Sequence, residues 1–74
     1  MSAKYPILSP KKVIKAMNRL GFHKISQKSS HIKYMNNNTG KIFIIPKHYE
    51  IARGTLRSIL EQANIELDEF LKNL

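Results

Sequence analysis

The chain has 74 residues, no cysteine and a formal net charge of +8. This length predicts one domain, residues 1–74, near the lower size limit for folding without disulfides or metal ions. A sequence without cysteine excludes a disulfide framework and thiolate chemistry, and no apolar run is long enough to span a bilayer. Because the N-terminal apolar stretch is also too short for a signal peptide, we expect a cytoplasmic protein with no membrane role.

The charge is distributed unevenly along the chain. The first 49 residues contain ten Lys or Arg and no Asp or Glu, whereas the remainder contains three cations and all five carboxylates. A small domain that leaves so much positive charge uncompensated repels itself, so we expect a polyanionic partner. Nucleic acid is the obvious one, since each neutralised phosphate adds affinity. The basic part has no carboxylate to hold Mg²⁺, and neither a metal site nor another cofactor is predicted.

The first predicted element is a helix. Ser9 is a suitable N-cap, Pro10 suits the first helical position, and Gly21 is typical of the residue that follows a helix. Between them, apolar residues recur at helical spacing, at Val13, Ile14, Met17 and Leu20. Four cations occupy the remaining surface, either as a solvated face or as a stripe that contacts phosphates.

The next part of the chain has the pattern of a sheet. Alternating and β-branched residues predict strands at 22–28, 30–35 and 41–45. The connection between the first two is very short, and residues 36–40 form a turn cluster before the third. Such short connections require antiparallel neighbours. Pro46 is expected to end the sheet, and residues 47–53 to form a connecting loop.

Two helices are predicted in the C-terminal part. The first runs from Gly54 to about Ala63, with Asn64 as a plausible C′ residue, and a last short helix lies within residues 65–74. The predicted fold is therefore α+β with the order α-β-β-β-α and a short final helix. Helices packed on one face of a three-stranded antiparallel sheet would bury both apolar surfaces and leave the other sheet face open.

His31 is the residue most suited to chemistry. By strand alternation it shares a face with Lys33 and opposes Ile32 and Tyr34, which are expected to face the core, so its side chain should point outward. His48 follows the third strand and could lie near the rim of the same face. Each histidine has a simpler interpretation as a structural or exposed residue, and this is the favoured one for His23.

An imidazole among lysines suits metal-independent RNA cleavage. With a reference pKa of about 6.5, imidazole can accept the proton of a ribose 2′-OH or protonate the departing 5′-oxygen. Nearby ammonium groups can bind the phosphate and offset the charge that builds on it. We therefore predict His31 as the catalytic residue and His48 as a possible second acid or base. The predicted phosphate-binding residues are Lys28, Ser30, Lys33 and Lys47, although each lysine also fits a solubilising role on an edge strand.

Four segments in this order and spacing resemble the HicA (YcfA-like) toxin family: GF at 21–22, QKSSH at 27–31 with Tyr34 three residues later, IPKH at 45–48, and GTLRSIL at 54–60 followed by Ala63. The resemblance covers about residues 7–74. It implies a fold similar to the double-stranded-RNA-binding domain, an mRNA-cleaving endoribonuclease activity and a HicB antitoxin that occludes the toxin. The histidine of the family's Gly-Ser-His motif corresponds to His31.

This chain departs from the family pattern at one position. Ser29 stands where the family usually has Gly, and a requirement for positive φ there would strain a serine. Farther along, Gly54 and Thr55 have two interpretations: together with Arg57 they contact an anion or partner at a helix N-terminus, or they simply begin and cap that helix.

Two other functions fit the same residues. One is a non-catalytic RNA-binding module with the shape of a double-stranded-RNA-binding domain, which reads shape and phosphates. The other is a protein-interaction subunit whose basic surface meets an acidic partner.

Overall fold

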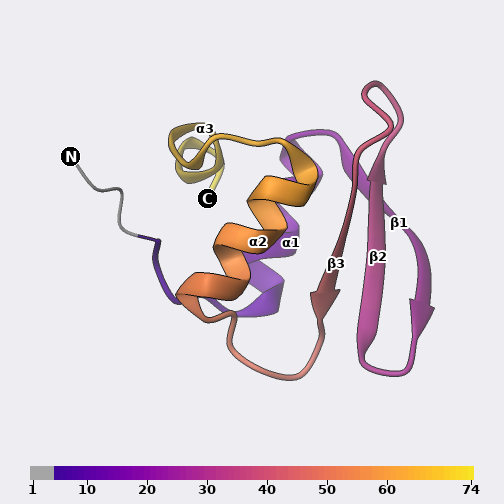
Figure 1. Ribbon diagram of the computed structural model, residues 1–74, viewed down its shortest axis with the longest axis horizontal. Coiled ribbons are helices and arrows are strands. Elements are labelled where there is room, and N and C mark those ends of the chain that lie inside the picture. Colours follow the sequence, from indigo (N-terminus) through magenta and orange to yellow (C-terminus); the bar gives the residue numbers. More distant parts are fainter. Residues whose placement is uncertain (1–4) are drawn as a thin grey trace.

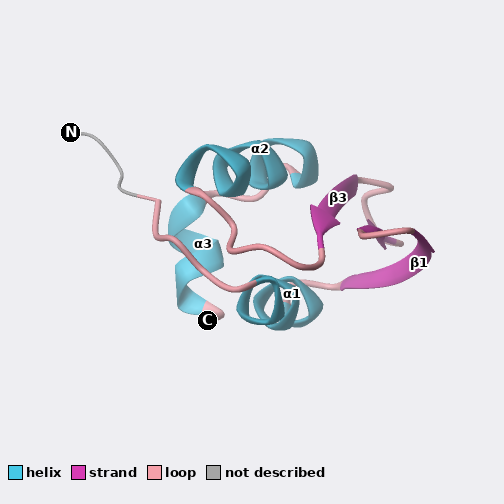
Figure 2. Ribbon diagram, turned by 90° about the horizontal axis from the view of Figure 1, so that it is seen from below, coloured by secondary structure: helices cyan, strands magenta, loops and turns pink. Residues whose placement is uncertain are grey.

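The structure is a computed structural model that describes residues 5–74; the predicted domain of residues 1–74 thus includes four residues outside the described range. The elements are α1 (Pro10–Arg19), β1 (Phe22–Lys28), β2 (His31–Asn36), β3 (Ile42–Pro46), α2 (Arg53–Ala63) and α3 (Leu67–Lys72). The strands form one antiparallel sheet in the order β1-β2-β3, and the helices gather on one side of it (Figures 1 and 2). The α+β fold predicted from the sequence is confirmed.

The ends of α1 follow from local chemistry. The Ser9 hydroxyl accepts a hydrogen bond from the Lys12 N–H at 3.3 Å, which is the predicted N-cap. At the other end, Gly21 has a φ of +98°, and a Cβ added there would lie 3.1 Å from Asn36 Nδ2. That amide donates to the Leu20 carbonyl at 3.2 Å. A side chain at position 21 would therefore be strained and would crowd the amide that satisfies the helix end.

An aromatic cluster lies at the centre of the core. The fully buried ring of Phe43 on β3 stacks on Tyr34 of β2, with centroids 5.3 Å apart, and packs edge-to-face with Phe22, with centroids 5.2 Å apart. Burial raises the pKa of the Tyr34 hydroxyl. The folded state therefore favours the neutral phenol. The free energy of unfolding does not depend on this group at lower pH, and it falls as the pH rises above the ordinary pKa of 10.0.

The segment before α2 contributes to the core as well. Leu8 and Ile51 exchange backbone hydrogen bonds, with N···O distances of 3.3 and 2.7 Å, and Ile51 is fully buried. The sequence pattern predicts only a connecting loop here. The bridge joins the start of the described chain to the entrance of α2, so this loop is anchored at its C-terminal end.

Strand β1 contains a bulge. Lys24 pairs with Tyr34, but the next aligned pair is Ser26 with Lys33, so Ile25 is an extra residue with no partner on β2. The extra residue shifts the alternation of β1 by one. Ser26 therefore lies on the same face as Lys33, which is the face that the helices leave uncovered.

Several predicted boundaries move by one or two residues. Strand β2 begins at His31 rather than at residue 30, and Pro46 is the last residue of β3 rather than the residue that follows it. Helix α2 begins at Arg53, with Ala52 as its N-cap and no side-chain cap. Asn64 has the left-handed conformation expected of a residue that ends a helix. None of the helices within residues 5–74 combines the length and the apolar composition needed to cross a membrane.

Candidate nucleic-acid interface

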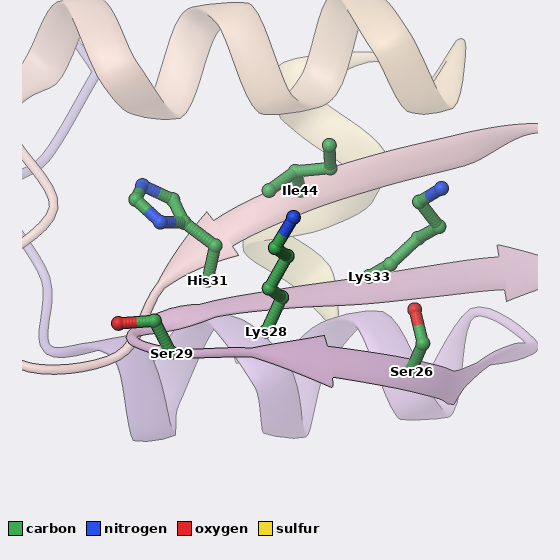
Figure 3. Close-up of a pocket in the computed structure, with 6 residues that line it drawn as sticks. All are labelled: Ser26, Lys28, Ser29, His31, Lys33 and Ile44. Carbon is green, nitrogen blue, oxygen red and sulfur yellow. The ribbon is translucent and has the colours of Figure 1, made fainter.

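An open cavity of about 580 Å³ lies on the uncovered face of the sheet. All three strands and the β1–β2 turn contribute to it. The residues that line it are Ser26, Lys28, Ser29, His31, Lys33 and Ile44. Figure 3 shows their side chains in front of the strands, with His31 near the turn and Lys33 farther along the sheet. Each of these residues is exposed.

The register places His31 between two strands. It pairs with Lys28 on β1 and with Pro46 on β3, and directly opposed residues have Cβ atoms about 4.5–5.5 Å apart. Lys33 follows His31 by two residues on the same strand face, a separation of about 6.6 Å. The structure thus brings together three residues singled out from the sequence. Their roles stay predictions.

The sheet carries no opposing carboxylate, because the chain has no Asp or Glu before Glu50. Within residues 5–74, the ion pair between Arg57 Nε and Glu61 Oε2 at 3.2 Å, on the exposed surface of α2, is the only one formed. Lys28 and Lys33 are therefore not neutralised by a carboxylate partner. Their charges add to a positive potential at the cavity, which favours an anionic ligand.

Ser30, Lys47 and His48 do not line the cavity. The Lys47 N–H donates to the Ser30 carbonyl at 2.7 Å. This hydrogen bond holds the segment after β3 against the β1–β2 turn, at the same end of the sheet as His31. His48 is exposed and directly follows Lys47. Its place at the rim of the open face stays a prediction.

The start of α2 is not part of the cavity. Gly54 and Arg57 are exposed and Thr55 is half-buried, but none of them lines the space around His31. The interpretation of Thr55 as a helix cap is wrong, because Ala52 is the N-cap and no side chain caps this helix. Among the described residues, no group of three or more His, Asp or Glu side chains could hold a metal ion.

Ser29 is strained in the turn that leads to His31. Its φ is +59°, whereas the φ of Ser30 is not positive, which is the sign pattern of a type II′ hairpin turn. Glycine is favoured at the first central position of that turn because it has no Cβ. The requirement for positive φ considered from the sequence is therefore present. Gln27 Nε2 donates to the Ser29 carbonyl at 3.3 Å and supports the turn.

Replacement of Ser29 by glycine is expected to stabilise the protein by about 1 kcal/mol, because a left-handed conformation costs a non-glycine residue about that much. In a domain of this size such a gain raises the Tm by about 4–8 °C. Ser30→Gly is the matched control: it changes the neighbouring turn residue, whose φ is not positive, and should lower the Tm slightly. Equal shifts for the two variants in a thermal melt would contradict the strain at Ser29.

Three residues of the cavity were not predicted as site residues: Ser26, Ile44 and Ser29, the last of which was noted only as a departure from the family motif. Ile44 lies in the strand predicted at residues 41–45, yet 43% of its surface is exposed, because Phe43 and Ile45 on either side are buried. Alternation along β3 contains that signal. Ser26 had no such signal, since the bulge at Ile25 decides its face.

The fold and the cavity define a small basic α+β domain with an exposed histidine between lysines on its open sheet. A family model for the HicA toxin of bacterial toxin–antitoxin systems matches residues 10–65, which are 56 of the 74 residues and include the whole cavity. The chain therefore belongs to the HicA toxin family, as its motifs predicted. A toxin of this kind implies an antitoxin partner. No curated protein matches the chain.

Proposed function

We propose that this protein is an endoribonuclease toxin that binds mRNA over the open sheet and cleaves it with His31 as the essential acid or base. The observation that carries the proposal is the exposed imidazole of His31 opposite Lys28, in a cavity that Lys33 also lines. Membership of a toxin family supports it. The uncompensated charge of the first 49 residues supports an RNA substrate.

The proposed reaction is attack by the ribose 2′-oxygen on the adjacent phosphorus. As the 2′-O–P bond forms, a base takes the 2′-hydroxyl proton, and the P–O5′ bond breaks as an acid protonates the departing 5′-oxygen. His31 performs one of these two proton transfers. The ammonium groups of Lys28 and Lys33 stabilise the negative charge on the phosphate oxygens. The products are a 2′,3′-cyclic phosphate and a 5′-hydroxyl.

The second proton transfer has three candidates. His48 is one, because the Lys47–Ser30 hydrogen bond holds its segment at the same end of the sheet as His31. Lys28 is another, since it lies directly opposite His31. Water is the third. Ser30 and Lys47 are proposed to contact RNA phosphates beyond the cavity, and Gly54, Thr55 and Arg57 to contact RNA or a partner.

The proposed partner is a HicB-like antitoxin that covers His31 and acts with the toxin in the cytoplasm. Since that antitoxin would occupy the surface that binds RNA, the two ligands should exclude each other. Titration of such a partner into a cleavage assay should stop the reaction in proportion to the complex formed.

The test is cleavage of a defined single-stranded RNA, with the product ends identified by mass spectrometry. Because the proposed chemistry needs only an imidazole and cations, we expect a 2′,3′-cyclic phosphate and undiminished cleavage in excess EDTA. A strict requirement for Mg²⁺, or products with 3′-hydroxyl ends, would refute this mechanism. RNA that is bound but never shortened would instead identify a non-catalytic RNA-binding module.

A further inference from the structure

We propose that Ile44 forms the floor of a subsite for one nucleobase, so that the substrate is an unpaired RNA strand. This inference rests on the proposed function and names the form of RNA that the same cavity takes. It concerns a residue with no charge and no reactive group, which the cleavage chemistry itself does not use.

Ile44 lies beside the cations of the cavity. Ile44 on β3 pairs directly with Lys33 on β2, and Lys33 pairs in turn with Ser26 on β1. Direct pairs have Cβ atoms about 4.5–5.5 Å apart. An exposed aliphatic side chain therefore lies within one side-chain length of an ammonium group, and both line the same cavity.

Because Ile44 is aliphatic, the part of RNA expected to contact it is a base and not the sugar or the phosphate. Phosphates and ribose hydroxyls are strongly hydrated and gain nothing from contact with an aliphatic group, whereas burial of apolar surface against the flat face of a base is favourable. The methylene stems of Lys28 and Lys33 can extend the apolar surface while their ammonium groups contact the adjacent phosphate. A cavity of about 580 Å³ lies in the range of small-molecule sites and has room for one nucleotide.

A base within a duplex cannot place its face against Ile44. In an A-form duplex both faces of each base are stacked on neighbours, and the accessible minor groove presents 2′-hydroxyls and base edges. Contact between Ile44 and a base face therefore requires a base that is unstacked from its strand. An unpaired strand also allows the 2′-oxygen to swing into line with the P–O5′ bond near His31, which the regular duplex prevents.

Ile42 provides a matched control on the same strand. It pairs with Met35, lies on the same sheet face and has 39% of its surface exposed, against 43% for Ile44. Unlike Ile44, it does not line the cavity. Alanine at either position should therefore have a similar small effect on stability, and only the Ile44 variant should affect RNA.

The experiment measures binding of a short single-stranded RNA, and of the same sequence as a duplex, to His31→Ala protein with and without each isoleucine substitution. We expect Ile44→Ala to weaken single-strand binding about five- to tenfold, as for loss of a base-packing contact, and Ile42→Ala to have no effect. The dependence of log Kd on log salt should keep its slope, because no phosphate contact is lost. Duplex binding should be weaker and equal for all variants.

A scan of single abasic sites through the oligonucleotide identifies the base concerned. One abasic position should weaken binding to the otherwise unaltered His31→Ala protein, and Ile44→Ala should add no further loss there. Equal single-strand affinity for the Ile44 and Ile42 variants would overturn the inference. Tighter binding of the duplex would overturn it too. The proposed function fails separately, if His31→Ala still cleaves RNA.

Discussion

Replacement of His31 by alanine is expected to reduce RNA cleavage by about 10²–10⁴-fold, the usual contribution of a positioned acid or base. The substitution removes the imidazole and leaves Lys28 and Lys33 in the cavity. RNA affinity should therefore change little, because phosphate contacts supply most of it. The side chain is exposed, so the Tm should also stay within a few degrees of the wild type. The measurements are kcat/KM on a defined RNA, Kd for the same RNA, and growth of cells that express the protein.

The chain offers a matched control in His23. It is exposed on β1 and pairs with Met35, which puts it on the same open face, but it does not line the cavity. His23→Ala should keep full activity. Wild-type cleavage by His31→Ala protein would remove His31 from the mechanism, whatever its position.

His48→Ala assigns the second proton transfer. If His48 is the partner of His31, its loss should lower kcat by a similar factor and remove one limb of the pH–rate profile. Unchanged kcat in this variant would leave Lys28 or water as the group that makes the second proton transfer. A loss of kcat in Lys28→Ala would then identify Lys28, and unchanged kcat would identify water.

Replacement of Phe43 by alanine is expected to destabilise the fold by about 3–5 kcal/mol. Phe43 is fully buried and contacts both Tyr34 and Phe22, so truncation leaves a cavity between the sheet and the helices that strand packing cannot close. A chain of 74 residues has a total stability of about 4–11 kcal/mol. The variant should thus be close to unfolding, which urea denaturation followed by circular dichroism would measure.

Ile44→Ala is the control for that variant. The two residues are neighbours on β3, and only Phe43 faces the core. The exposed position should cost no more than about 0.5–1 kcal/mol. A loss below about 1 kcal/mol for Phe43→Ala would show that the aromatic cluster is not the centre of the core. Both Phe43→Ala and His31→Ala should abolish toxicity, but only the first should lose its circular dichroism signal.

The sequence alone was enough to predict the elements and the outward direction of His31. Ser9 and Gly21 bound α1 through their own hydrogen-bonding and φ preferences, which are local properties of the chain. The alternation of His31, Ile32 and Lys33 is equally local, because successive side chains on a strand point to opposite faces. The motifs of these same segments indicated the family.

Which residues line the cavity was decided by the tertiary structure. Strict alternation from the buried Phe22 would place Lys28 on the covered face of the sheet. The bulge at Ile25 shifts the register by one residue and brings Lys28 opposite His31 on the open face. Register and bulges are set by pairing between strands and by packing on the helices, so no pattern within β1 reveals them. For the same reason the burial of Ile51 became visible only in its pairing with Leu8.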